Sequence, residues 1–354
     1  MKLVDLIARR FREHPGLDGA NGANGANGAA DAAGAGANGA AVHGGPVLPP
    51  GLWERALLDP AREFLVRPGK GLRGRLVESG WALAGGGPDG PPPELPALVE
   101  LLHAGSLIID DIQDGSEERR GAPALHRTRG TAVALNTGNW MVLLPLHLLG
   151  QIDLPEASAR AAHERVAATL VSCHQGQALD LLPVGELGHG EIGPVVAMST
   201  LLRTASLTEL SAVLGGLAAG ADPAVLAALA DLGRELGRGL QMLDDLGGLI
   251  ARERRAKGYE DLRQNRPTWA WAWAAEARSE PEYDQLRAAA RQVAAGEDVE
   301  PLRKRLAGAV GTIGRERAQA GLRRAWAQLV DRFPASRARD QVAADLEQVE
   351  QSYG

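Results

Sequence analysis

The stretch from Leu101 to Asp114, LLHAGSLIIDDIQD, contains the residues that decide the fold. Its apolar residues recur at helical spacing and give way to three carboxylates, Asp110, Asp111 and Asp114. Carboxylates one and four residues apart repel one another on a helix, and a cation between them relieves the repulsion. Divalent ions that bridge carboxylates to substrate phosphates are the natural cations here, magnesium above all. The stretch therefore predicts a buried helix that ends at a metal-binding site.

A second stretch, GRGLQMLDDLGG, has the same design and carries Asp244 and Asp245. Two acidic helix ends in one chain predict that Asp110 and Asp244 face each other across a cleft. Metal ions held in that cleft would trap a diphosphate group between the two helices.

The composition favours a helical globular protein. The 354 residues are 45% hydrophobic and 23% charged, with few aromatic and β-branched residues. The net charge of −6 argues against a general nucleic-acid-binding protein, so we expect no nucleic-acid partner. The single cysteine, Cys173, excludes an internal disulfide and is typical of a reducing, cytoplasmic location.

Apolar runs of helical length follow one another along the chain, without sustained strand-like alternation. We expect an all-α fold: a single-domain bundle of ten or more helices around a central apolar cavity. The expected helices are 53–66, 71–84, 96–112, 130–149, 156–182, 194–215 and 223–246, followed by a helical region over 268–351.

The first 45 residues differ from the rest. Residues 1–15 predict an amphipathic helix, which either packs on its own protein or touches a membrane surface. Residues 16–45 contain an Asn-Gly-Ala repeat and predict a disordered linker. The folded domain is expected over 46–354, with no stable membrane insertion, because Pro145 and His147 interrupt the longest apolar run.

Basic and polar residues accompany both acidic stretches in a fixed order. They are Lys70 and Arg73 in RPGKGLRGR, His103, Arg119 and Arg120 after DDIQD, Arg203 and Thr204 in LLRTAS, Gln241, Lys257, and Arg266 in RQNRPT. This order resembles the trans-isoprenyl diphosphate synthase (polyprenyl synthetase) family from about Pro46 onward. The forms DDIQDGSEERRG and EDLRQNRPT are closest to the geranylgeranyl diphosphate synthase type.

The resemblance implies an enzyme, a prenyltransferase that joins an allylic diphosphate to isopentenyl diphosphate, usually as a homodimer. It implies about three magnesium ions, held by Asp110, Asp111, Asp114, Asp244 and Asp245. Arg119, Arg203 and Lys257 would contact the allylic diphosphate, with Thr204 and Gln241 as polar helpers and Arg266 as a further substrate contact. Lys70, Arg73, His103 and Arg120 would hold isopentenyl diphosphate.

Residues one turn before Asp110 bear on product size. Ser106 and Gly105 are small, so the cavity would continue past them towards Leu102, which predicts a product of twenty carbons or more. Replacement of Gly105 by Phe is expected to shorten the product.

Several positions depart from the family pattern. Gly248 stands where a third aspartate is usual, Arg203 and Arg266 stand in place of lysines, and Gly74 in place of a proline. Two alternatives therefore stay open. One is a class I terpene cyclase on the same fold, and the other is a non-catalytic subunit of a prenyl diphosphate synthase.

Overall fold

The chain is helical, as the sequence predicted. The computed structural model describes residues 51–353, with side chains to residue 347, so the predicted N-terminal helix and linker lie outside the described residues. The α-helices are α2 (Asp59–Leu65), α3 (Leu72–Leu83), α4 (Glu94–Gln113), α5 (Leu125–Arg129), α6 (Thr131–Leu149), α7 (Glu156–Asp180), α8 (His189–Thr200), α9 (Ser206–Ala218), α10 (Pro223–Ile250), α11 (Arg255–Arg263), α12 (Trp269–Ala277), α13 (Glu280–Ala294), α14 (Val299–Arg332) and α15 (Arg337–Tyr353).

Short elements interrupt the helices. Two π-helical turns, η2 (Glu54–Leu58) and η4 (Leu201–Ala205), precede α2 and α9, and a 3₁₀ turn, η3 (Val184–Glu186), precedes α8. A hairpin pairs β1 (Glu118–Arg119) with β2 (Ala122–Pro123). The sequence predicted one helix over 194–215, whereas η4 separates α8 from α9 there. π-helical turns of this kind are frequent at functional sites.

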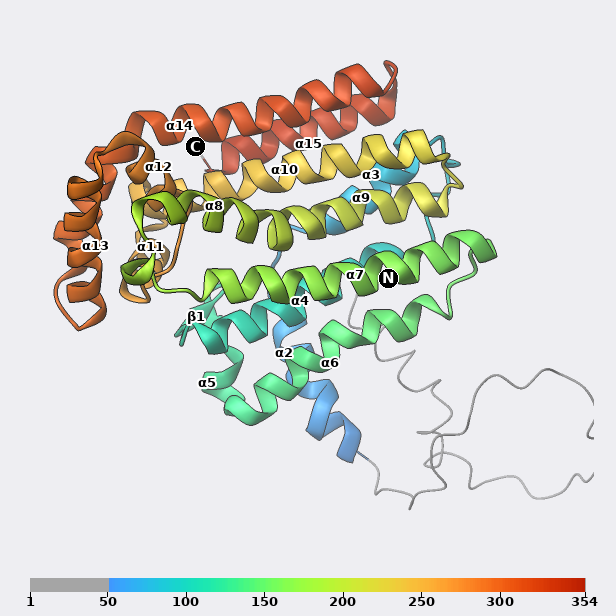
Figure 1. Cartoon of the computed structure of the whole chain (residues 1–354). Coiled ribbons are helices and arrows are strands. Elements are labelled where there is room, and N and C mark those ends of the chain that lie inside the picture. Colours follow the sequence, from blue (N-terminus) through green and yellow to red (C-terminus); the bar gives the residue numbers. More distant parts are fainter. Residues whose placement is uncertain (1–50, 354) are drawn as a thin grey trace, which may run out of the picture. The chain divides into compact units, whose positions relative to one another are not determined.

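The chain divides into two compact units, which we describe separately. The first unit contains, among the described residues, 51–70 and 101–142. It holds α2, the second half of α4, the hairpin, α5 and the first part of α6 (Figure 1). Within it, α4 packs tightly on α6, and α2 contacts α5.

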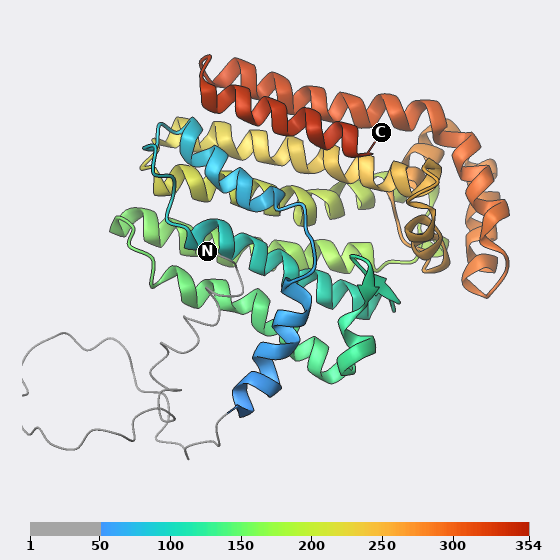
Figure 2. The ribbon, with the colours of Figure 1, turned by 180° about the vertical axis from the view of Figure 1, so that it is seen from behind.

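The second unit contains residues 71–100 and 143–354. Its centre is α10, which packs against α9 and α14, while α12 contacts α8 and α14 (Figure 1). From behind, α3 covers α9 and contacts α15 (Figure 2). Helices α3 and α9 approach closely because Gly80 and Gly215 have no side chain: a Cβ on Gly80 would lie 2.0 Å from the carbonyl oxygen of Ala212.

One described helix, α6, is long and apolar enough to cross a membrane by length and composition, with a mean hydropathy of 1.3. In this structure 44% of its most apolar window is buried inside the protein, and core helices of globular proteins meet the same criterion.

Candidate active site

The residues predicted from sequence fall into two groups, one in each unit. The first unit holds Lys70, Leu102, His103, Gly105, Ser106, Asp110, Asp111, Asp114, Arg119 and Arg120. The second unit holds Arg73, Arg203, Thr204, Gln241, Asp244, Asp245, Lys257 and Arg266. That the two acidic clusters face each other stays a prediction, and the geometry within each group is given below.

In the first group, one face of α4 carries a polar stripe. His103, Ser106, Asp110 and Asp114 follow at intervals of three or four residues and are all partly exposed. The Ser106 hydroxyl donates to the His103 carbonyl at 2.9 Å, so this short side chain folds back on its own helix. Asp110 lies in the last turn of α4 and Asp114 directly follows the helix, where the Asp114 N–H donates to the Asp110 carbonyl at 2.8 Å. The two residues thus lie one helical turn apart, as a shared metal ion requires.

Asp111 points elsewhere and has a different role from its two neighbours. Only 1% of its side chain is exposed, and its Oδ1 accepts a hydrogen bond from Arg119 Nε at 2.6 Å, while Arg119 Nη2 contacts the same oxygen. Arg119 belongs to β1, eight residues further along the chain. This ion pair fixes the hairpin to the end of α4 and orients the guanidinium of Arg119.

The hairpin itself places Arg120 at a tight turn. Arg119 pairs with Ala122, so Arg120 and Gly121 are the two central turn residues, with φ of 55° and 76°. Two positive φ angles are what a type I′ hairpin turn requires. Glycine adopts this conformation without strain, whereas an arginine pays about 1–2 kcal/mol. Arg120 therefore occupies a position that backbone stability alone would give to glycine.

The guanidinium of Arg120 lies against the loop that contains Lys70. It stands 5.7 Å from the ring centre of Phe64 on α2, and Arg67 stands 5.2 Å from the same ring. A Cβ on Gly69 would lie 3.1 Å from Arg120 Nη1, so the absence of a side chain at residue 69 leaves room for the guanidinium. Arg67 Nη1 also donates to the carbonyl of Arg119 at 3.3 Å. The loop before Lys70 and the hairpin thus form one cationic corner.

Gly105 does not have the environment expected of a cavity-lining residue. It is buried in the contact of α4 with α6, where a Cβ would lie 2.8 Å from the Gly138 carbonyl oxygen and 2.9 Å from the Val142 nitrogen. A phenylalanine there would push the two helices apart instead of filling a cavity. The proposed Gly105→Phe test of product length therefore fails on packing grounds, and Ser106, on the Asp110 stripe, is the better position.

In the second group, a chain of hydrogen bonds runs from η4 to α12. The Thr204 hydroxyl donates to Gln241 Oε1 at 2.6 Å, and Gln241 Nε2 donates to Asp245 Oδ1 at 2.8 Å. The other oxygen of Asp245 accepts from the backbone N–H of Trp269 at 2.7 Å. The structure thus brings Thr204 and Gln241 into contact and ties both to Asp245, while their role as polar helpers of the substrate stays a prediction.

This environment strongly changes the acidity of Asp245. Its burial, together with the nearby charges of Asp244 and Asp261, raises the pKa of Asp245 to about 8, although the N–H of Trp269 and the amide of Gln241 act in the opposite sense. In the absence of a cation, Asp245 is therefore mostly protonated at neutral pH.

Asp244 contacts Arg254 instead of the Thr204–Gln241–Asp245 chain. Its Oδ1 forms an ion pair with Nη2 of Arg254, which lies in the turn after α10. The third position of the cluster, Gly248, is buried where α10 meets α11: a Cβ on Gly258 would lie 2.0 Å from the Gly248 carbonyl oxygen. A Cβ on Gly248 itself would make only ordinary contacts, 3.4 Å from the Gly258 Cα. Packing therefore requires glycine at 258, but not at 248.

Arg203 and Arg266 converge on Asp180 at the end of α7. Arg203 Nη1 lies 2.5 Å from Asp180 Oδ2, and Arg266 Nη1 donates to the Asp180 carbonyl at 3.4 Å. Gly176 makes the approach possible, because a Cβ there would lie 2.7 Å from Cγ of Arg203. Lys257 pairs with Asp261 on α11 at 3.4 Å.

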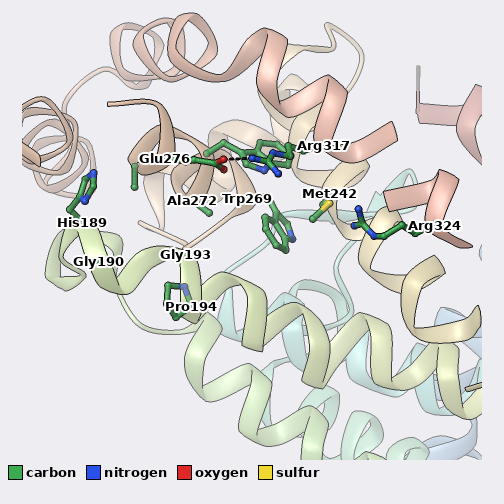
Figure 3. A pocket seen from close by; sticks show the side chains of 12 residues that line it. His189, Gly190, Gly193, Pro194, Met242, Trp269, Ala272, Glu276, Arg317 and Arg324 are labelled. Atoms are coloured by element: carbon green, nitrogen blue, oxygen red, sulfur yellow. Dashed lines mark hydrogen bonds and ion pairs between the residues drawn. The ribbon is translucent and has the colours of Figure 1, made fainter. Parts of the chain in front are cut away.

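An apolar groove of about 420 Å³ lies within the second unit, lined by residues of α8, α10, α12 and α14 (Figure 3). Trp269 forms part of its wall, together with Met242 of α10, and Arg317 spans its rim by pairing with Glu276. The Trp269 indole N–H donates to Thr200 Oγ1 at 2.9 Å. Trp269 thus lines the groove with its side chain and donates to Asp245 with its backbone N–H.

The residues present fit a magnesium site at which the substrate's phosphates provide part of the ligands. Within residues 51–347, no three His, Cys, Asp or Glu side chains come together as a complete metal cage. Magnesium is usually bound by one or two carboxylates, with substrate phosphates and water completing the shell. Asp110 and Asp114 provide such a pair of partly exposed carboxylates on one helix face.

Comparison with known proteins now identifies the family. The family model described as polyprenyl synthetase matches residues 54–306, which is most of the chain. The chain belongs to the polyprenyl synthetase family. A geranylgeranyl diphosphate synthase of Mycobacterium tuberculosis is 36% identical over 187 residues, 51% of each chain. Geranylgeranyl pyrophosphate synthase 2 of Zymoseptoria tritici is 36% identical over 130 residues, 36% of this chain and 37% of that protein. The matched region thus spans about half or less of these relatives.

Solved structures agree on the fold. A polyprenyl synthase from Caulobacter crescentus, complexed with calcium and isoprenyl diphosphate, is 26% identical with a TM-score of 0.70, over 82% of this chain and 86% of that chain. A decaprenyl diphosphate synthase from Rhodobacter capsulatus is 21% identical with a TM-score of 0.73, over 86% and 91% of the two chains. The resemblance to this family and the all-α class predicted from sequence are both confirmed.

Proposed function

We propose that this protein is a trans-prenyltransferase, which condenses an allylic diphosphate with isopentenyl diphosphate. The segment DDIQDGSEERRG carries the proposal, because its fold gives each residue type a separate task. Asp110 and Asp114 present carboxylates on one helix face, while Asp111 is withdrawn to orient Arg119. Membership of the polyprenyl synthetase family supports the same activity.

The reaction breaks the bond between the allylic C1 and its diphosphate oxygen, and the electron pair leaves with the diphosphate. The double bond of isopentenyl diphosphate then attacks the allylic cation to form the new carbon–carbon bond. The new cation loses a proton to the released diphosphate, and the electron pair of the broken C–H bond forms the product's double bond. Arg119, held by Asp111, stabilises the negative charge on the departing diphosphate. Arg120 and Lys70 hold the diphosphate of the second substrate in the cationic corner.

Magnesium is the proposed metal, and when bound it neutralises the leaving diphosphate. Asp110 and Asp114 are the residues that would hold it in the first unit, and Asp244 in the second. The calcium and isoprenyl diphosphate bound by the Caulobacter crescentus relative support a divalent ion in this family.

For the product we propose geranylgeranyl diphosphate. The curated relatives that match this chain include several geranylgeranyl diphosphate synthases, and the small side chain of Ser106 lies one turn below Asp110. The decaprenyl diphosphate synthase among the similar structures marks longer products as the competing outcome.

For the assembly we propose a homodimer formed through the helices beside the first acidic cluster. Val133 and Leu135 on α6, which packs on α4, are 38% and 40% exposed, respectively, which is high for large apolar side chains. A second copy of this chain would cover such residues.

The deciding experiment offers the purified protein dimethylallyl, geranyl or farnesyl diphosphate with magnesium, with and without isopentenyl diphosphate. Longer prenyl diphosphates, detected by mass spectrometry, support the proposal. Hydrocarbons formed without isopentenyl diphosphate would indicate a terpene cyclase instead, and no product at all would favour a non-catalytic subunit. Asp114→Asn should abolish elongation, and the matched control Asp89→Asn, in an exposed loop, should not.

A further inference from the structure

The second acidic cluster contains a cation of its own. Arg254 lies in the turn between α10 and α11 and reaches back over α10, where its Nη2 pairs with Oδ1 of Asp244. Both side chains are part-exposed, at 27% and 29%. The sequence ARERRAK gave no sign of this contact, because the pairing depends on how the turn folds back.

Gly247 makes room for the arginine. A Cβ at this position would lie 2.8 Å from Arg254 Nη1 and 3.3 Å from its Cδ. The guanidinium therefore lies on bare helix backbone beside Asp244. A side chain of any size at 247 would displace it, so the glycine and the arginine together form a built contact.

Of the positions in this cluster, Asp244 is the one whose carboxylate is available to bind a cation. Both oxygens of Asp245 accept hydrogen bonds within the protein, from Gln241 and from the Trp269 backbone. Position 248 is a glycine and provides no carboxylate. A divalent ion that enters this cluster must therefore compete with Arg254 for Asp244.

We propose that Arg254 is an internal counter-cation, which occupies the Asp244 carboxylate until a divalent ion with its diphosphate displaces it. The inference rests on the proposed function, because the competing ligand is the metal–diphosphate group. It predicts weaker metal binding than an unblocked cluster would show. A part-exposed ion pair of this kind changes affinity by a factor of about 1.5 to 5.

The test measures metal binding directly, without turnover. Binding of Mn²⁺ to the full-length protein is followed by electron paramagnetic resonance in the presence of inorganic pyrophosphate. Arg254→Gln should bind Mn²⁺ about threefold more tightly than the natural protein. The matched control is Arg252→Gln, which removes the same charge from an exposed position in the same turn and should leave the affinity unchanged.

Three results would overturn the inference. They are an unchanged affinity in Arg254→Gln, an equal gain in Arg252→Gln, and a weaker affinity, which would make Arg254 a ligand of the pyrophosphate. The gain must also vanish when Asp244→Asn is added to Arg254→Gln; its persistence would place the competition elsewhere.

Failure of the inference can be told from failure of the proposed function. A protein that binds Mn²⁺ with pyrophosphate and elongates prenyl diphosphates, but is insensitive to Arg254→Gln, refutes the inference alone. A protein that neither binds Mn²⁺ with pyrophosphate nor elongates prenyl diphosphates refutes both.

Discussion

Asp111 accepts a hydrogen bond from Arg119 at 2.6 Å while only 1% of its side chain is exposed. Asp111→Asn would remove the charge that compensates the guanidinium, and breaking a buried pair in this way costs about 3 kcal/mol. Asp111→Asn should therefore lower the free energy of unfolding by about this amount, measured by urea denaturation. Asp114→Asn, at a partly exposed position directly after the same helix, should leave stability within about 0.5 kcal/mol and weaken metal binding instead. Equal destabilisation by the two substitutions would contradict these separate roles.

Because Arg120 has a positive φ, substitutions at this position should affect stability and substrate binding independently. Arg120→Gly and Arg120→Ala both remove the guanidinium, so both should weaken binding of isopentenyl diphosphate by tenfold or more, roughly the loss of a charged hydrogen bond. Only glycine relieves the backbone strain at φ 55°, so Arg120→Gly should be more stable than Arg120→Ala by about 1 kcal/mol. Thermal unfolding and substrate titration of the two variants provide the comparison. Equal melting temperatures would show that the turn relaxes when the arginine is removed.

The pKa of Asp245 predicts a pH-dependent stability in metal-free buffer. Because the pKa of about 8 in the folded protein lies above the ordinary value of 3.8, the folded state binds one proton more than the unfolded state between these pH values. The stabilising contribution is complete below the ordinary value and is lost as the pH rises towards 8. Asp245→Asn cannot titrate, so its melting temperature relative to the natural protein should rise from about pH 5 to about pH 8.5. A difference that is constant over this range would exclude a raised pKa.

Asparagine is a fair replacement at this position. Its oxygen can still accept from Trp269, and its amide can donate to Gln241 once the Gln241 amide turns over. The Thr204 hydroxyl would then accept from Gln241 where it now donates. The pH comparison thus removes the titrating group while it keeps the hydrogen bonds.

Ser106 is the position at which product length should respond. Ser106→Phe adds a large ring one turn below Asp110, on the same face of α4, and should shift the product distribution towards shorter prenyl diphosphates. Chain lengths are read by mass spectrometry of the extracted products. Gly105→Ala is the packing control: its Cβ would press on Gly138 and Val142, so it should cost about 1–3 kcal/mol of stability and leave chain length unchanged. Shorter products from Gly105→Ala, or unchanged products from Ser106→Phe, would remove α4 from the control of chain length.

The sequence was sufficient for the fold class, because helical periodicity is a local property of the chain. The hairpin after DDIQD escaped prediction, since strands of two residues have no measurable alternation. The sequence also did not show that Gly105 lies in the contact with α6, because spacing along α4 carries no information about residues of another helix.

In the second acidic cluster, too, some features were predictable from the sequence and others were not. Its carboxylates were evident as a motif, but the separate fates of Asp244 and Asp245 depend on Arg254, Gln241 and Trp269. Trp269 is 24 residues beyond Asp245 and donates through its backbone, which every residue except proline can do. A pattern of side chains in the sequence therefore could not predict this backbone contact.

The turn at Arg120 also bears on how this protein could be engineered. A laboratory selection that rewards heat resistance alone would favour glycine at this position and discard the guanidinium without any visible penalty. Libraries aimed at a tougher catalyst should therefore hold residue 120 fixed, or couple every round to turnover. The same reasoning warns against consensus redesign of short hairpins in which a strained residue is proposed to bind a ligand.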